Sequence, residues 1–180
     1  MILGIFRLVL LSGFLLLCGC GVVGATKDLV TKSQAIVGFG PNKVSSIGIV
    51  VDQGFIARAE VVEIVFAYGD APAAALSSAT AQQWFVERLG YCRTYGSQID
   101  VLRLEIPMGY SMLITDLPDD HLLAQAILVY IADIGMVDVT QSITPWIRIA
   151  DGEAVLGETA VGQESNSRPV EAVFGGKPIC

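Results

Sequence analysis

Residues 61–68, Val-Val-Glu-Ile-Val-Phe-Ala-Tyr, form the most regularly patterned stretch of this chain. Every second residue from Val62 to Tyr68 is bulky and apolar, so these side chains share one face of an extended segment. The intervening residues, which include Glu63, fall on the opposite face. The stretch therefore predicts a β-strand with two distinct faces.

Neighbouring stretches add further strands. Residues 99–106 alternate in the same way, with apolar residues from Leu102 to Ile106 on one face and Arg103 and Glu105 on the other. Further strands are expected over residues 45–51, 110–117 and 145–150, and residues 153–156 could extend the last one.

Residues 122–134 allow two interpretations, a buried helix or a buried strand. The run from Ile127 to Ile131 favours a β-strand, and an acidic turn precedes it. We therefore expect a strand that begins at about Ala126.

One helix is expected between the second and third strands. Residues 69–79 are interpreted as a connection, after which Thr80 and Gln83 form a capping-box pattern. The spacing of Phe85, Leu89 and Cys92 predicts that these three side chains face inward. Gly96 is expected to end the helix. Short strands, turn residues and a single helix together predict a mainly β fold, a two-sheet β-sandwich with one inserted helix.

Composition excludes several classes of function. The chain has 180 residues, 11 Lys and Arg against 18 Asp and Glu, a net charge of −7 and a mean hydropathy of +0.60. This length is typical of one domain with tails. An acidic chain does not favour nucleic acid as a partner, since phosphate binding needs a basic face. With a single histidine, His121, and no Cys-x-x-Cys pair, neither a metal site nor a cofactor is expected.

The first 19 residues have the pattern of a secretory signal. Arg7 supplies the positive charge, and the following apolar run of residues 8–17 is shorter than the ~20 residues that span a bilayer. The end of the segment resembles a bacterial lipobox, in which Gly19 precedes an acylated cysteine, Cys20. A transmembrane anchor and ordinary secretion with a free Cys20 are the alternatives. By the same resemblance, Gly21 after the cysteine implies delivery to the outer membrane.

The remaining chain divides into three parts. Residues 20–44 are interpreted as a lipidated tether, residues 45–156 as the β-sandwich domain and residues 157–180 as a flexible C-terminal tail. Cys92 and Cys180 would lie in an oxidising compartment, where they could form a disulfide. The alternative is a buried free thiol at Cys92 and a loose Cys180.

Two groups of side chains could carry chemistry or bind a small ligand. Asp119, Asp120 and His121 could serve an enzyme, but a solvated turn is the favoured interpretation; no catalytic residue is assigned. Trp84, Tyr91 and Tyr95 could form a stacking platform for a ligand, whereas packing of a helix on a sheet explains such aromatic residues more simply.

A third group lies in the loop of residues 52–60. Phe55 and Ile56 are apolar and Arg58 follows them, so this loop is a candidate contact surface for a partner. The alternative is that both apolar side chains plug one end of the sandwich.

The order of these features resembles the TssJ family of outer-membrane lipoproteins, which belong to the type VI secretion membrane complex. The resemblance rests on the lipobox, the tether, the strand that ends near Asp52, the strand of residues 61–68, the Ala-rich insertion with Trp84-Phe85, and the turn at residues 107–109. It covers residues 45–156. It implies a transthyretin-like β-sandwich with an added helix. It also implies that the loop of residues 52–60 binds the periplasmic domain of TssM, the inner-membrane partner of that family. Pilotins of secretin systems are a second lipoprotein class to consider.

The sequence thus leads to a functional hypothesis. We expect a non-enzymatic lipoprotein, acylated at Cys20 and inserted by its lipid in the outer membrane, which faces the periplasm and positions an envelope-spanning secretion complex. The candidate partner contacts are Phe55, Ile56 and Arg58. The alternative function is the binding of a small ligand or a peptidoglycan fragment.

Overall fold

The computed structural model describes residues 40–53, 59–157 and 170–172, together with Cys180. Its fold is mainly β, and two sheets pack face to face as the sequence predicts. The five-stranded sheet has the order β8-β7-β1-β4-β9 and the four-stranded sheet has the order β3-β2-β5-β6. The strands are β1 (Ile47–Val51), β2 (Ala59–Ala67), β3 (Ile99–Pro107), β4 (Ser111–Ile114), β5 (Ala126–Ile131), β6 (Gly135–Asp138), β7 (Trp146–Ala150), β8 (Glu153–Gly157) and β9 (Val170–Ala172).

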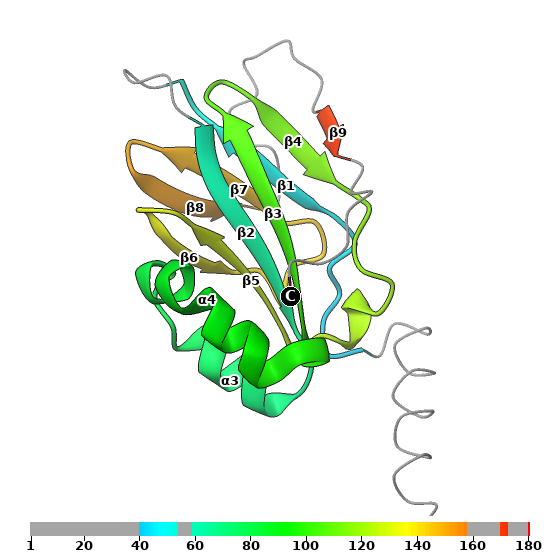
Figure 1. Cartoon of the computed structure of the whole chain (residues 1–180). Helices are drawn as coiled ribbons and strands as arrows, with labels where there is room; N and C mark the ends of the chain where they lie inside the picture. Colours follow the sequence, from blue (N-terminus) through cyan, green and yellow to red (C-terminus); the bar gives the residue numbers. More distant parts are fainter. Residues whose placement is uncertain (1–39, 54–58, 158–169, 173–179) are drawn as a thin grey trace, which may run out of the picture.

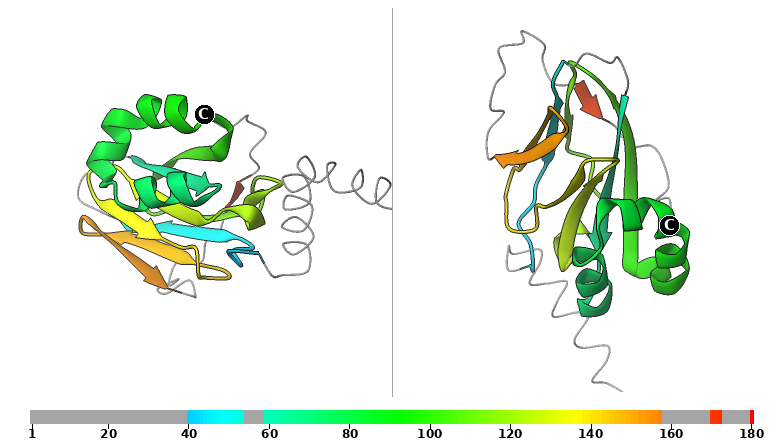
Figure 2. Two further views of the ribbon diagram at one scale, coloured as in Figure 1. Left: turned by 90° about the horizontal axis from the view of Figure 1, so that it is seen from below. Right: turned by 90° about the vertical axis from the view of Figure 1, so that its left-hand side faces the viewer.

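The two helices, α3 (Asp70–Ser77) and α4 (Ala81–Tyr95), cover the outer face of the four-stranded sheet. Figure 2 shows the resulting three layers, with the helices on one side, the four-stranded sheet in the middle and the five-stranded sheet beyond it. Two short 3₁₀ turns, η1 (Gly96–Gln98) and η2 (His121–Leu123), precede β3 and β5. The four-stranded sheet is therefore buried on both faces.

Strand β2 has the two faces that its alternation predicts. Val62, Ile64 and Phe66 lie in the core between the sheets, and all three are fully buried. Val65 and Ala67 lie in a second core, between the sheet and the helices. The alternation of the sequence thus separates two cores rather than a core and a solvent face.

Residues 122–134 contain a strand, as expected, and it is β5. All six residues of β5 are buried, since the strand pairs with β2 on one side and β6 on the other. A strand with both faces covered has no need of polar residues, which is why its sequence also resembled a buried helix. The following strand β6 was not predicted.

Helix α3 corrects the interpretation of residues 69–79 as a connection, and it makes two inserted helices where one was expected. Pro72 is tolerated there because it lies in the first turn, where its missing N–H has no helical partner to lose. Alanine then continues the helix, and Pro72 and Leu76 are the residues that it buries.

Helix α4 begins as predicted, with the Thr80 and Gln83 capping box formed in both directions. Its inward face differs from the prediction, because Leu89 is 62% exposed. The fully buried residue of this helix is Trp84, whose ring faces the sheet, and Phe85 and Cys92 pack beside the core only in part. Trp84 therefore sets the rotation of the helix.

Both ends of the domain differ from the sequence-based division. Asn42 and Val44, assigned to the tether, are buried in the domain. Residues 170–172, assigned to the tail, form β9 and pair in parallel with β4. Cys92 and Cys180 form a disulfide, with their Cα atoms 5.2 Å apart. The chain is thus attached to α4 at its last residue.

Candidate docking surface

The chain joins the sandwich at one end of the sheets. The side-chain amide of Asn42 donates hydrogen bonds to the backbone carbonyls of His121 and Ala124, at 2.7 and 2.9 Å. Its oxygen accepts a hydrogen bond from the N–H of Val44, which is fully buried. These contacts fix the position at which the N-terminal part of the chain meets the domain, just before β1 begins at Ile47.

The connection between β1 and β2 starts at the opposite end. Strand β1 extends for five residues from Ile47 to Val51, and a rise of about 3.3 Å per residue separates its ends by roughly 16 Å. In Figure 1 the described chain begins, before β1, at the lower end of the sheets, while β2 begins and β3 ends at the top. The turn between β3 and β4 lies at this same upper end.

Backbone hydrogen bonds hold the first residues of the loop of residues 52–60. The N–H of Val51 donates to the carbonyl of Tyr110 at 3.0 Å, and the N–H of Gly109 donates to the carbonyl of Val51 at 2.8 Å. The N–H of Asp52 donates to the carbonyl of Ile149 at 2.9 Å. The base of the loop is therefore attached to the β3–β4 turn on one side and to β7 on the other.

An ion pair strengthens this base. Arg148 Nε lies 3.0 and 3.2 Å from the two carboxylate oxygens of Asp52, and Nη2 lies 2.5 Å from one of them. The hydrogen bond and the charge of Asp52 raise the pKa of Arg148. Gly109, at φ +78°, lies against Gln53, and a Cβ at this glycine would be 3.1 Å from Gln53 Cγ. The direction in which the loop leaves β1 is thus set by neighbouring elements.

The predicted contact residues themselves, Phe55, Ile56 and Arg58, lie outside the described residues, as does Cys20. Their roles stay predictions.

Comparison with known proteins gives one structural likeness. No family model and no curated protein matches the sequence. The structure is similar to that of Serratia marcescens Lip, a membrane-bound component of the type VI secretion system. The two are 10% identical with a TM-score of 0.45, over 66% of this chain and 98% of the Serratia chain.

Within the described part of the chain, no helix has the length and apolarity needed to cross a bilayer.

The aromatic side chains of α4 pack against the sheet. Trp84 is fully buried, and its ring stacks on Tyr91 and Tyr130 with centroid distances of 5.7 and 5.0 Å. Tyr95 packs in part against the same core. Since Trp84 already has aromatic neighbours and no exposed surface, it offers no platform to a ligand.

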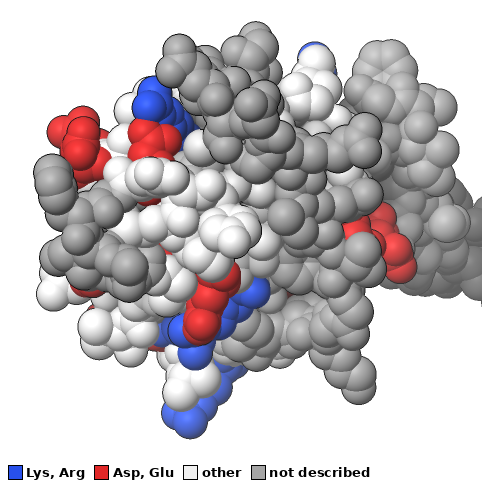
Figure 3. Space-filling model, turned by 90° about the horizontal axis from the view of Figure 1, so that it is seen from above, with Lys and Arg blue, Asp and Glu red and all other residues white. Residues whose placement is uncertain are grey.

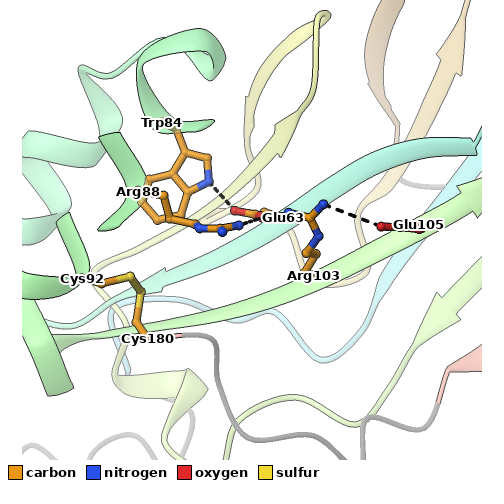
Figure 4. Close-up of polar contacts among 7 residues, drawn as sticks. All are labelled: Glu63, Trp84, Arg88, Cys92, Arg103, Glu105 and Cys180. Carbon is orange, nitrogen blue, oxygen red and sulfur yellow. Dashed lines mark hydrogen bonds and ion pairs between the residues drawn. A yellow bond between two sulfur atoms is a disulfide. The ribbon is translucent and has the colours of Figure 1, made fainter. Parts of the chain in front are cut away.

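A buried carboxylate beneath α4 was not anticipated. Glu63 is fully buried and accepts hydrogen bonds from Trp84 Nε1 at 2.8 Å, from Arg103 at 3.0 Å and from Arg88. Arg103 also lies 3.6 Å from Glu105 (Figure 4). The signal in the sequence is the pair of Glu63 and Arg103 on matching faces of adjacent strands, which can be recognised only when their register is known.

The remaining candidates lie at a turn. Asp119 is exposed, and the His121 ring nitrogen Nδ1 lies 2.8 Å from the carbonyl of Pro118. Among the described residues, no group of three or more His, Cys, Asp or Glu side chains could hold a metal ion. The turn structure fits the favoured interpretation of these residues.

Proposed function

We propose that this protein is an outer-membrane lipoprotein, acylated at Cys20 and facing the periplasm, which anchors and positions an envelope-spanning type VI secretion complex. In this proposal it acts without catalysis, by docking the periplasmic domain of a TssM-like inner-membrane component on the loop of residues 52–60. Phe55, Ile56 and Arg58 are the contacts that we propose.

One observation carries the proposal: the chain meets the domain at Asn42, and the loop begins at Asp52, at opposite ends of the sandwich. A lipid at one end and a docking loop at the other would hold a partner away from the membrane surface. Confinement to the membrane also raises the local concentration of the docked domain without any new contact. The attached base favours binding, because Asp52 is already held by Ile149 and Arg148 and loses less entropy when a partner docks.

The lipid would supply the attachment. Each inserted methylene contributes ~0.8 kcal/mol, so several acyl chains would keep the protein in the membrane. In this scheme residues 1–19 are removed as a signal peptide and residues 20–44 largely form the tether. The alternative function, binding of a small ligand by Trp84, Tyr91 and Tyr95, is not favoured, because the Trp84 ring is fully buried.

A binding experiment tests the docking loop. The double variant Phe55→Asp, Ile56→Asp should bind the periplasmic domain of the TssM-like partner at least about tenfold more weakly, since a charge in an apolar contact is costly to desolvate. Ile143→Asp is the matched control, because Ile143 is 60% exposed and its carbonyl bonds to Ser45 at the tether end. Equal binding by the double variant and the control would show that the loop assignment is wrong.

A fractionation experiment tests the anchor. Cys20→Ala should move the protein from the outer-membrane fraction to the soluble periplasmic fraction or leave it as an uncleaved precursor. Retention of a processed chain in the outer membrane would contradict lipid anchoring at this residue.

A further inference from the structure

A groove lies between the start of α4 and the turn that joins β5 to β6. These two segments lie at the left of Figure 1. Its volume is about 860 Å³. Phe85 and Val86 line it from the helix, and Ile134 and Met136 line it from the turn and β6. The groove is formed entirely by residues that the structure describes.

The walls of the groove are apolar and in part exposed to water. Val86 is 78% exposed, which is unusual for a bulky apolar residue beside a concavity. Phe85 and Met136 are half-buried and pack against the core between the helices and the sheet. Methionine adapts its shape to different neighbours, so it suits the surface of a binding groove. An apolar occupant would displace water from all three side chains.

The polar groups of the groove indicate the chemistry of its occupant. Asp133 is the only charged lining residue; it is exposed, and it forms no ion pair within the described part of the chain. Its carboxylate would attract a Lys or Arg side chain and repel an anionic lipid headgroup. The N–H groups of Ala81 and Gln82, in the first turn of α4, have no partner within the helix and can donate to a carbonyl. Apolar side chains, a cation and backbone carbonyls occur together in a polypeptide.

The groove also adjoins the end of the sandwich that carries the docking loop. The N–H of Ala132, a lining residue, donates to the carbonyl of Val61 at 3.0 Å, two residues after β2 begins. Figure 3 shows this end from above, where uncharged surface adjoins a group of acidic and basic side chains, and further acidic side chains lie at the margin of the described residues. A protein docked at the loop could therefore extend into the groove.

We propose that this groove binds an apolar polypeptide segment with one Lys or Arg residue, which a partner protein contributes beside its contact with the loop of residues 52–60. This proposal rests on the proposed function, according to which the partner that contributes the segment lies in the periplasm. The apolar side chains lie against Val86 and Met136, and the basic residue pairs with Asp133.

Site-specific photocrosslinking of the full-length lipoprotein in cells tests the proposal. The photoreactive residue p-benzoylphenylalanine replaces Val86 in one variant and Leu89 in the other. Leu89 is the matched control, because it is 62% exposed on the same helix but does not line the groove. We expect at least fivefold more crosslinked protein from position 86, and mass spectrometry should find apolar residues and a Lys or Arg in the crosslinked peptide.

A second measurement tests the charge. Asp133→Asn keeps the shape of the side chain and tolerates the positive φ of this residue, 60°. It should reduce the crosslink from position 86 about two- to fivefold, the range typical of an exposed ion pair. Asp133→Glu, which keeps the charge, should retain more of the crosslink than Asp133→Asn.

Several results would overturn the proposal. They are equal crosslinking at positions 86 and 89, a crosslink to a second copy of this chain, a crosslink to lipid alone, a crosslinked peptide without a basic residue, no crosslink at all, and no effect of Asp133→Asn.

The Phe55→Asp, Ile56→Asp variant separates the two proposals. If this double variant still binds the partner, and position 86 crosslinks to that partner, the loop assignment fails and the groove stands. If it loses the partner while position 86 of the unaltered loop gives no crosslink, the groove fails and the loop stands.

Discussion

Replacing Glu63 by glutamine should destabilise the domain strongly, although the two side chains have nearly the same shape. The carboxylate accepts from Trp84 on one oxygen and from Arg88 and Arg103 on the other. A glutamine amide has one accepting oxygen and one donating nitrogen, so at least one of these donors would face another donor. The charge that balances Arg88 beneath the helix would also be lost.

The magnitude follows from the burial of each partner. Breaking a fully buried ion pair costs about 3–5 kcal/mol. Here the carboxylate side chain of Glu63 has no exposure, but Arg88 is 24% and Arg103 is 37% exposed, so water solvates the cations in part. We therefore expect Glu63→Gln to lower the free energy of unfolding by about 2–4 kcal/mol.

Chemical denaturation monitored by far-UV circular dichroism measures this change, with the slope against denaturant expected to stay constant. Glu105→Gln is the control, because Glu105 is 65% exposed and pairs with the same Arg103 at 3.6 Å. It should cost less than about 1 kcal/mol. Losses of equal size in the two variants would refute the view that the buried carboxylate attaches α4 to the sheet.

Three further predictions concern stability. Cys92→Ser should lower the free energy of unfolding by up to about 4–5 kcal/mol, because the bond to Cys180 closes a sequence separation of 88 residues; two free thiols in the unreduced protein would exclude the bond. Gly48→Ala should lower the free energy of unfolding, measured by heat or denaturant, by about 1–3 kcal/mol, since the new Cβ would lie 2.2 Å from a ring atom of Trp146. An equal loss when Trp146 is also replaced by alanine would contradict this cause. Burial raises the pKa of Tyr130 above 10.0, so an unfolded tyrosine ionises first and stability should fall as the pH rises above about 10; Tyr130→Phe should make that fall shallower, by up to ~1.4 kcal/mol per pH unit, and an unchanged slope would contradict it.

The strands that could be predicted from the sequence are those with a clear alternation or a β-branched run. Alternation over residues 62–68 and 102–106 predicts β2 and β3, and Asp151-Gly152 separates β7 from β8. Both turn residues adopt positive φ, which is typical of a tight hairpin. Local sequence chemistry was sufficient for the existence of these strands, but residues 153–156, expected to extend β7, fold back and pair with it as the antiparallel strand β8.

The elements that were missed depend on distant contacts. Strand β6 has four residues without alternation and exists because it pairs with β5. The rotation of α4 follows from the hydrogen bond between Trp84 and Glu63, which are 21 residues apart. A periodicity argument cannot include such a bond, so Leu89 was assigned to the wrong face.

The same contrast between local patterns and distant contacts applies to the candidate site. The two apolar residues of the loop of residues 52–60 predict a contact surface, which stays a prediction, but its attachment through Arg148 could not be predicted, since Asp52 and Arg148 are 96 residues apart. The groove beside α4 combines residues from two elements, one of which, β6, was not predicted at all.

One measurement tests the central claim most directly. The full-length protein is immunoprecipitated from gently solubilised envelopes, and mass spectrometry identifies both its N-terminal peptide and the proteins that accompany it. The account predicts an acylated Cys20 at the N-terminus together with a large inner-membrane protein that has a periplasmic domain. An acylated Cys20 without any protein partner would contradict the docking function, and an N-terminal peptide without acylation would contradict the anchor.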